Sequence, residues 1–338
     1  MPVITVNDGE AVFECRDGDN LLRAGLRAGV GLPYECGVGA CGCCRGEVVE
    51  GQVDDLWPEA PGLSARDRRK GRVLTCQSRP QDDVRLHLQL DAHAVPVIRP
   101  LRRTVRLAAV RDVTHDIREF VFQADAPADF LPGQYAFLAL PGVPRERAYS
   151  MANLPNEAGE WHFRIRRVAG GEATGTLFDH LAPGATAQLD GPYGLAHLRP
   201  DSPRDIVCIA GGSGLAPMLS VARGAAAHPA LAGRRLDFFY GGRTPADVCG
   251  EAELASLPGY GAQVRYHAAV SDPAAAEAAR WPGAVGPVHE LVERTLGERL
   301  DAAEFYLAGP PPMVEALQQL LQVTHRIAPE RIHFDRFF

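Results

Sequence analysis

Residues 36–44 read Cys-Gly-Val-Gly-Ala-Cys-Gly-Cys-Cys, and this stretch decides how the first third of the 338-residue chain folds. Four residues separate Cys36 from Cys41, two separate Cys41 from Cys44, and a further cysteine, Cys76, follows after 31 intervening residues. Four of the eight cysteines of the chain thus lie within nine residues. Because disulfides are rare in a reducing compartment, clustered thiols of this kind indicate metal ligands.

The spacing of these thiols favours a two-iron cluster over a zinc ion. Loop cysteines at four- and two-residue spacing, with a distant fourth cysteine, form the plant-type [2Fe–2S] pattern. A structural zinc site usually shows two closely spaced cysteine pairs, whereas Cys76 stands alone. Gly37, Gly39 and Gly42 suit a loop whose backbone approaches the sulfides and takes positive φ angles. We predict a [2Fe–2S] cluster with the ligands Cys36, Cys41, Cys44 and Cys76.

The other cysteines are given no role in the predicted cluster. Cys43 lies inside the loop, but it would break the spacing if it replaced a neighbour, so we expect it not to bind iron. Cys15, Cys208 and Cys249 have no partner at a ligand spacing. We interpret these three as buried free thiols.

Composition places the chain among ordinary globular proteins. Its 46% apolar content is typical, and its 338 residues suggest two or three domains. The sequence contains no run of 18 apolar residues, and the amino-terminal residues lack the basic flank of a signal peptide. The net charge of −7 argues against nucleic-acid binding. We expect a cytoplasmic protein that binds neither nucleic acid nor a membrane.

Hydrophobic periodicity divides the chain into three predicted domains. Residues 1–95 combine short alternating runs with a helical pattern at 21–28, which indicates a small α+β domain. Residues 100–200 contain short strands separated by Gly, Pro and Asn, a pattern typical of a barrel or a sandwich. Residues 203–338 alternate apolar strands with helices, which predicts a parallel, doubly wound α/β sheet.

Two motifs in the middle domain suit a flavin nucleotide. Arg147, Tyr149 and Ser150 lie on one predicted strand, where alternation puts Arg147 and Tyr149 on the same face. The guanidinium would pair with a diphosphate while the tyrosine ring packs on a flat heterocycle. A glycine turn at Gly171 opens a predicted helix that includes Thr174, and its free amides would bind phosphate. An ordinary strand with a surface salt bridge is the alternative interpretation of the first motif.

Two glycine turns in the last domain favour dinucleotide binding. The first follows a strand and reads Gly211-Gly212-Ser213-Gly214-Leu-Ala-Pro217. The second follows another strand and reads Gly309-Pro310-Pro311-Pro312-Met313. Glycines at the carboxyl ends of parallel strands let a pyrophosphate approach the backbone. The spacing departs from Gly-x-Gly-x-x-Gly, and two unrelated turns are the alternative.

With these motifs the whole chain resembles the three-domain reductases of bacterial oxygenases, in which a plant-type ferredoxin domain precedes a ferredoxin–NADP reductase-like FAD and NAD module. The resemblance implies a β-grasp ferredoxin domain, an antiparallel β-barrel FAD domain and an α/β NAD domain. It implies FAD contacts through Arg147, Tyr149, Ser150, Arg166, Val168, Gly171, Thr174 and Phe337, with Tyr149, Ser150 and Phe337 beside the flavin. It implies NAD contacts through Gly211, Gly212, Ser213, Gly214, Pro217, Arg243, Gly309, Pro310, Pro311 and Met313.

The resemblance also implies an electron path from NADH through FAD and the [2Fe–2S] cluster to an oxygenase component or its small ferredoxin. Residues 56–77 are most similar to the reductases of toluene-type diiron monooxygenases. Reductases of Rieske ring-hydroxylating dioxygenases share the cofactor motifs and stay an alternative, as do a reductase for a deoxysugar dehydratase and a non-enzymatic iron–sulfur carrier. Ala308 departs from the family, since many relatives have a cysteine there. No general base or nucleophilic triad is expected.

Overall fold

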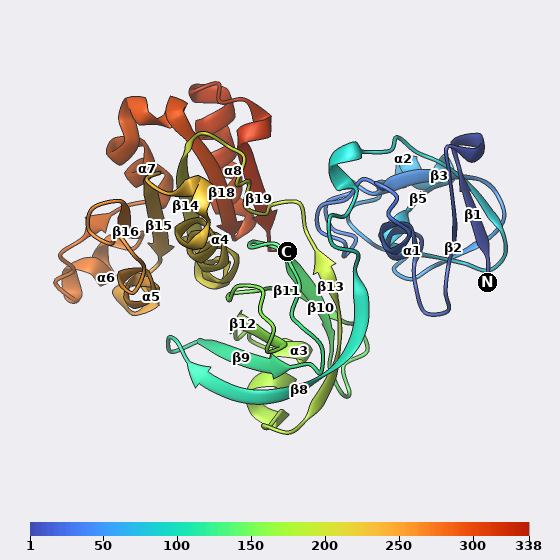
Figure 1. The fold of residues 1–338 in the computed structure, drawn as a ribbon, viewed down its shortest axis with the longest axis horizontal. Coiled ribbons are helices and arrows are strands. Elements are labelled where there is room, and N and C mark those ends of the chain that lie inside the picture. Colours follow the sequence, from blue (N-terminus) through green and yellow to red (C-terminus); the bar gives the residue numbers. More distant parts are fainter. Residues whose placement is uncertain (338) are drawn as a thin grey trace. The chain divides into compact units, whose positions relative to one another are not determined.

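The computed structural model describes residues 1–337, and the chain divides into two compact units (Figure 1). The first unit comprises residues 1–102 together with residues 190–195, and the second comprises the remaining described residues. Among the described residues, no helix is long and apolar enough to cross a membrane.

The first unit is an α+β fold whose five-stranded sheet has the order β2-β1-β7-β3-β5. Strands β1 and β7 are parallel, while the other neighbours are antiparallel. Helix α1 (Leu21–Ala28) begins where the Asn20 side chain accepts a hydrogen bond from the Arg23 N–H, and it ends at Gly29 with a φ of 85°. This unit confirms the predicted β-grasp fold. Its other elements are β1 (Val3–Val6), β2 (Ala11–Glu14), β3 (Arg45–Glu50), β4 (Val53–Asp55), α2 (Ala65–Arg69), β5 (Arg72–Leu74), β6 (Ser78–Pro80) and β7 (Val84–His87).

The second unit begins with an antiparallel barrel of six strands in the order β11-β10-β13-β8-β9-β12. Alternation along β12 sends Trp161, Phe163 and Ile165 into the barrel core, where each is at most 2% exposed. A short helix, α3 (Glu172–Gly175), follows β12. The barrel alternative of the predicted pattern is therefore correct, and the sandwich is not. The strands are β8 (Leu101–Asp112), β9 (Ile117–Gln123), β10 (Tyr135–Ala139), β11 (Arg147–Ser150), β12 (Glu160–Arg166) and β13 (Thr186–Tyr193).

The rest of the second unit is a six-stranded sheet in the order β17-β16-β15-β14-β18-β19, with all neighbours parallel. Helices cover both faces, so the predicted doubly wound α/β fold is confirmed (Figure 1). Strand order reverses between β14 and β18. The strands are β14 (Asp205–Gly211), β15 (Leu236–Gly242), β16 (Val264–Val270), β17 (Ala284–Val285), β18 (Ala303–Gly309) and β19 (Ile332–Arg336), and the helices are α4 (Leu215–Ala227), α5 (Glu251–Ala255), α6 (Pro273–Ala278), α7 (Val288–Leu296) and α8 (Pro311–Gln318).

The two helix-covered faces have separate cores. One face buries Met218 and Leu219 of α4 against residues such as Cys208 and Tyr306 of the sheet. The other face buries side chains of α7 and α8, including Val292 and Leu317, against the same strands. Near-continuous apolar strands such as β14 are expected in a parallel sheet that is covered on both sides. The predicted boundaries of the three domains stay predictions.

Candidate functional site

The first candidate site is the thiol-rich loop of the first unit, which runs from the end of α1 to β3. The sulfur atoms of Cys44 and Cys76 lie 3.2 Å apart. The Cys41 N–H donates to the sulfur of Cys36 at 3.4 Å, and the Cys43 N–H donates to the sulfur of Cys41 at the same distance. Amide donors aimed at sulfur stabilise negative charge on thiolates and on a bound cluster. This donor set fits an iron–sulfur cluster.

The backbone of this loop depends on residues without a side chain. Gly37, Gly39 and Gly42 have φ angles of 63°, 91° and 80°, in the region that other residues rarely adopt. A Cβ atom on Gly42 would lie 2.5 Å from the carbonyl oxygen of Gly62. The Gly62 N–H also donates to the carbonyl of Gly39 at 3.0 Å. Gly42 therefore has to lack a side chain for the loop to fold against the segment around Gly62.

Burial separates the predicted ligands from the extra thiol. Cys36, Cys44 and Cys76 are 6%, 2% and 1% exposed, and Cys41 is partly buried. Cys43 is exposed, and its sulfur lies 3.6 Å from a carboxylate oxygen of Glu35. The ligand atoms of Glu35, Cys41 and Cys43 all lie within 4.8 Å of one another. Sequence reasoning missed Glu35, because its nearness to Cys43 arises only when the loop turns back.

The second candidate site is the strand β11, which carries the predicted flavin motif. Burial raises the pKa of Tyr149 to about 12, and its ring makes an edge-on contact with Phe163 at a centroid distance of 6.4 Å. Ser150 lies within 3.4 Å of a carboxylate oxygen of Asp335, to which its hydroxyl donates. The Arg147 guanidinium donates to backbone carbonyls of its own loop, one of them that of Arg145 at 2.9 Å. Arg147 and Tyr149 both lie on β11, the strand predicted for them, and both side chains are half-buried.

The turn that follows β12 is held by Thr174. Its hydroxyl accepts from the Val168 N–H at 3.2 Å and lies 3.2 Å from the Gly171 carbonyl. Gly170 has a φ of 70°, and the helix that begins at Glu172 has four residues. Thr174 thus fixes the shape of the turn, while Val168 is 58% exposed beside it.

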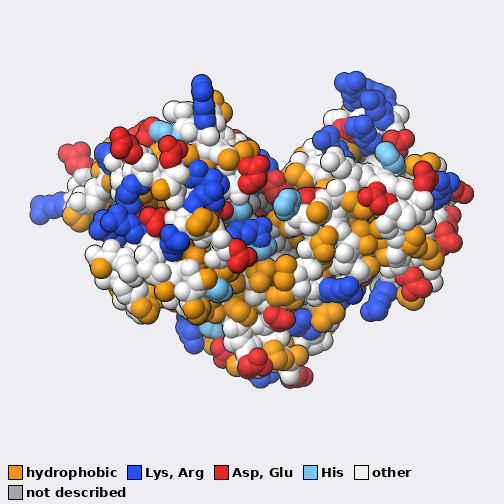
Figure 2. Space-filling model, turned by 45° about the horizontal axis from the view of Figure 1, so that its top comes forward, with side chains coloured by type: hydrophobic (Ala, Val, Ile, Leu, Met, Phe, Trp, Pro, Cys, Tyr) orange, Lys and Arg blue, Asp and Glu red, His pale blue; other side chains and the backbone are white. Residues whose placement is uncertain are grey.

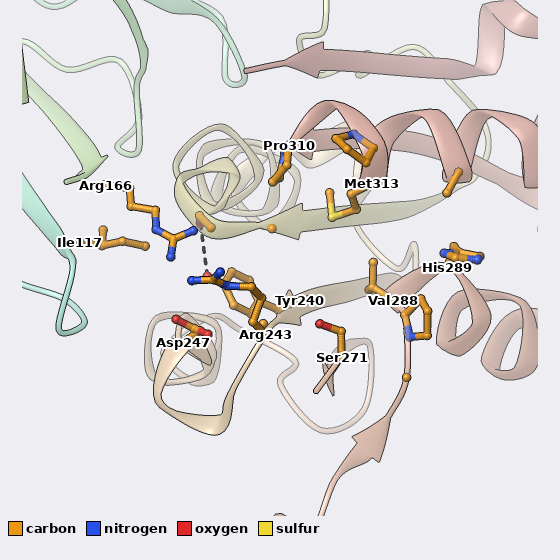
Figure 3. Close-up of a pocket in the computed structure, with 18 of the residues that line it drawn as sticks. Ile117, Arg166, Tyr240, Arg243, Asp247, Ser271, Val288, His289, Pro310 and Met313 are labelled. Carbon is orange, nitrogen blue, oxygen red and sulfur yellow. Dashed lines mark hydrogen bonds between the residues drawn. The ribbon is translucent and has the colours of Figure 1, made fainter. Parts of the chain in front are cut away.

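The third candidate site is a cavity of about 310 Å³ at the carboxyl edge of the parallel sheet (Figure 3). Five of the residues predicted for NAD line it, namely Gly211, Gly212, Arg243, Pro310 and Met313. It lies where β14 and β18 diverge, which is the usual ligand position in a doubly wound sheet. The hydroxyl of Tyr240 donates to the carbonyl of Gly212 at 3.2 Å and supports the first glycine turn.

The other residues predicted for NAD do not line this cavity. Gly214 is instead needed for packing, because a Cβ atom there would lie 2.0 Å from the carbonyl oxygen of Ala308. Pro217 is buried in the first turn of α4. The three remaining residues stand in the two glycine turns beside the cavity wall: Ser213, Gly309 and Pro311.

Several residues that line the cavity were not predicted for it. Arg166, which was predicted for FAD, lines this cavity and pairs with Asp116 at 2.6 Å. Asp247 accepts from the Thr244 N–H at 2.8 Å; burial tends to raise the pKa of its carboxyl, but the hydrogen bonds from Thr244 outweigh it and lower the pKa. The sequence already indicates Asp247 as an acid close to Arg243, whereas Ser271, which directly follows β16 at the carboxyl edge of the sheet, was not predicted. The pair of Arg166 with Asp116 joins β12 to the turn before β9 and leaves no local signal in the sequence.

Phe337 lies next to the second glycine turn. Its N–H donates to the carbonyl of Gly309 at 3.2 Å, and its partly buried side chain packs against the core under α4. Phe334 packs against the core on the other face of the sheet. Strand β19, which pairs with β18, therefore delivers the end of the described chain to the edge that holds the cavity.

The structure combines three features: a thiol-rich loop in a β-grasp unit, an antiparallel barrel, and a cavity at the switch point of a parallel sheet. These features define the class of flavin- and nucleotide-dependent iron–sulfur oxidoreductases. Family models agree with it along the chain. Residues 4–81 match a 2Fe–2S iron–sulfur cluster binding domain, 104–198 an oxidoreductase FAD-binding domain, and 208–319 an oxidoreductase NAD-binding domain.

Known proteins resemble the chain over its full length. It is 43% identical to the ferredoxin–NAD(+) reductase component of the alkene monooxygenase system of Xanthobacter autotrophicus, covering 98% of this chain and 99% of that one. It is 34% identical to the reductase component of the phenol 2-monooxygenase of Pseudomonas sp., covering 99% and 94%. The solved ferredoxin reductase of carbazole 1,9a-dioxygenase superposes with a TM-score of 0.91 at 36% identity, covering 100% and 98%. The chain belongs to the family of three-domain oxygenase reductases, with [2Fe–2S], FAD and NADH as its cofactors.

The burial and donor pattern of the loop predicts which cysteines hold the cluster. Replacing Cys36, Cys41, Cys44 or Cys76 by Ser should abolish the visible absorption of the cluster, because each substitution removes a metal-bound thiolate. Cys43→Ser is the matched control and should keep the full absorption. Iron and sulfide content with visible spectra of the five purified variants test this. Cluster loss in Cys43→Ser together with retention in Cys44→Ser would contradict the assignment.

Proposed function

We propose that this chain is the reductase component of a multicomponent oxygenase that acts on aromatic or other hydrocarbons, and that it works in the cytoplasm. In this role it takes electrons from NADH and delivers them one at a time to an oxygenase component or to its small ferredoxin. The observation that carries the proposal is the presence, in one chain, of a nucleotide cavity, a flavin strand and a cysteine loop. The full-length similarity to reductases of oxygenase systems supports it.

Four thiols of the first unit would hold the cluster, namely Cys36, Cys41, Cys44 and Cys76. A bound flavin accepts a hydride and releases single electrons, and a two-iron cluster carries them one by one. The residues of the loop supply placement: three nearly buried thiols keep water away, and backbone N–H groups offset charge on sulfur. The exposed edge of the loop at Cys43 would face the acceptor.

The second unit would hold FAD and NADH. Arg147 would pair with the flavin diphosphate, Tyr149 would pack on the ring system, and the N–H groups after Gly171 would add phosphate contacts. Phe337 would approach the flavin from the side of the Gly309 turn. The nucleotide would lie in the cavity lined by Gly211, Gly212, Arg243, Pro310 and Met313. This arrangement brings nicotinamide and flavin together without an acid or base, since hydride transfer needs contact and orientation.

Two alternatives concern the partner, and one concerns catalysis. The similar proteins serve both monooxygenase and dioxygenase systems, so a Rieske dioxygenase partner competes with a diiron monooxygenase. A deoxysugar dehydratase partner would use the same cofactors. A simple iron–sulfur carrier would need neither the cavity nor the two carboxyl-terminal domains. Reconstitution of turnover with a purified diiron hydroxylase or a purified Rieske oxygenase distinguishes the partners.

The order of electron flow gives the main test of this function. Full-length Cys76→Ser, which should lack the cluster, should still oxidise NADH with ferricyanide, because FAD and the nucleotide cavity are untouched. It should fail to support oxygenase turnover and should reduce cytochrome c poorly. Steady-state NADH oxidation with each acceptor measures this for the variant and the unaltered chain. Oxygenase turnover at the unaltered rate would show that the cluster is not the exit for electrons.

Arg147→Ala should weaken the retention of FAD. The substitution removes a charge-assisted contact to the diphosphate that is worth about 1.5–3 kcal/mol, or about one to two decades in affinity. The protein should therefore purify with little flavin, and added FAD should restore activity. Flavin content after gel filtration and a fluorescence titration with FAD give the two readouts. An FAD affinity equal to that of the unaltered chain would remove Arg147 from the site.

NADH should be preferred over NADPH. Arg243 is the basic residue that the stretch after β15 contributes to the cavity, and the carboxylate of Asp247 lines the same cavity. A 2′-phosphate would meet repulsion from this carboxylate, whereas a ribose hydroxyl would not. Asp247→Asn should narrow the difference in kcat/KM between the two nucleotides. A higher kcat/KM with NADPH for the unaltered chain would overturn the expectation.

A further inference from the structure

Helix α2 of the first unit and the residue that caps its carboxyl end carry three cationic side chains that form no ion pair within residues 1–337. These residues, Arg66, Arg69 and Lys70, are all exposed. Their spacing of three and four residues places them on one side of the helix turn. Figure 2 shows Lys and Arg side chains gathered and projecting over the part of the first unit that contains this helix. We call these three residues the basic ridge.

The basic ridge stands out against an acidic unit. Residues 1–102 and 190–195 contain thirteen Lys and Arg and sixteen Asp and Glu residues, yet five of the thirteen basic residues fall between 66 and 72. The neighbouring Arg45 and Arg72 share the buried Asp67, at 3.2 and 2.9 Å, and Arg68 pairs with Asp55 at 3.4 Å. Arg45, Arg68 and Arg72 are thus neutralised by ion pairs within the unit, whereas the positive charges of the ridge have no acidic partner among the described residues.

Carboxylates near the ridge do not cancel its charge. The surface around the ridge consists of the cysteine loop, Arg45 and the segment 55–72. It contains six basic residues and four acidic ones, which are Glu35, Asp55, Glu59 and Asp67. Asp55 and Asp67 are already paired, and Glu35 approaches Cys43. The surface beside the loop is therefore positive, although the chain as a whole has a net charge of −7.

The helix that bears the ridge is fixed to the cysteine loop. The Gly62 N–H donates to the Gly39 carbonyl at 3.0 Å, and Arg68 donates to the carbonyl of Ala60 at 3.1 Å. Arg45, which follows Cys44 directly, reaches Asp67 in the middle of α2. Loop and helix therefore form one rigid piece, and any protein that covers the loop edge also meets the ridge.

The same surface has an apolar part. Leu56 is 37% exposed. The Trp57 ring packs close to Gly39, because a Cβ atom added to Gly39 would lie 3.1 Å from the ring. The exposed Cys43 lies on the same loop. Apolar and aromatic side chains beside a charged rim are the usual composition of a protein interface.

We propose that the basic ridge is the docking surface for an electron acceptor whose own docking face is acidic. The inference rests on the proposed function, because it names the chemistry of the partner that receives electrons from the cluster. Opposite charges next to the loop would steer the acceptor onto the edge through which electrons leave, and steering raises association rates most at low ionic strength. A helix face that is simply solvated would show no such dependence.

The test compares an acidic with a basic acceptor. The triple variant R66E/R69E/K70E and the unaltered holoprotein are assayed for NADH-dependent reduction of cytochrome b5, whose haem edge is acidic, and of cytochrome c, whose haem edge is basic. The variant should lose about tenfold in kcat/KM for cytochrome b5 at low salt, and the loss should shrink as salt screens the charges. Its kcat/KM for cytochrome c should be unchanged or higher.

A second triple variant, R234E/R235E/R265E, is the matched control. It changes the net charge equally, but its residues precede or begin β15 and β16, at the sheet edge opposite the cavity. The control should reduce cytochrome b5 at the unaltered rate. An equal loss in both triple variants, or no loss in the ridge variant, would overturn the proposal.

Two further measurements separate a failed docking surface from a failed protein. The ridge variant should keep the visible absorption of the cluster and its ferricyanide reductase activity, because the three exposed side chains make no ion pair with the loop or with the rest of residues 1–337. If charge reversal disturbs the loop, the variant R66Q/R69Q/K70Q removes the three positive charges without adding negative ones. It should still lower the rate of cytochrome b5 reduction. If the unaltered chain reduces none of the acceptors with NADH, the proposed function fails. If it reduces all of them and the ridge variants match it, the docking surface alone fails.

Discussion

The parallel pairing of β14 with β18 is the constraint on which the nucleotide end of the molecule depends. Ala210 lies opposite Ala308 in this pair, so the two glycine turns that follow begin side by side. The chain leaves the two strands toward opposite faces of the sheet, and the divergence opens the cavity. Gly214 must lack a side chain, because the first turn passes directly over the Ala308 carbonyl. Strand β19 then pairs with β18 and brings Phe337 to the same edge.

The cysteine loop obeys a related constraint in the other unit. A loop that surrounds a metal cluster must place several thiols and amide donors within a few ångströms, which leaves no room for side chains between them. Gly39 and Gly42 meet this need against Gly62, and the same contact carries the segment that leads to α2. The residues that shape the loop therefore also fix the charged surface beside it. This coupling is why the basic ridge stands next to the predicted electron exit.

Much of this architecture could be predicted because its causes are local. Cysteine spacing, strand periodicity and glycine turns after apolar strands each leave a signal within about ten residues, and the β-grasp, barrel and α/β folds follow from them. The features that escaped depend on distant segments. Arg166 lines the nucleotide cavity and pairs with Asp116, 50 residues away, and neither relation could be inferred from the sequence around it; its expected role at FAD stays a prediction. The role of Thr174 at a phosphate stays a prediction; its hydroxyl bonds hold its own turn.

Ala308 bears on how hydride transfer is achieved. At the position before the second glycine turn, the fully buried methyl group of Ala308 packs into the core under α4. Among the described residues no cysteine lines the nucleotide cavity, and burial raises the pKa of the Cys208 thiol on the neighbouring strand far above its usual range. Transfer must then depend on placement. The hydrogen bond from Ser150 to Asp335 ties β11, the strand proposed for FAD, to β19, next to the Gly309 turn, and would hold in place the two surfaces between which a hydride would pass.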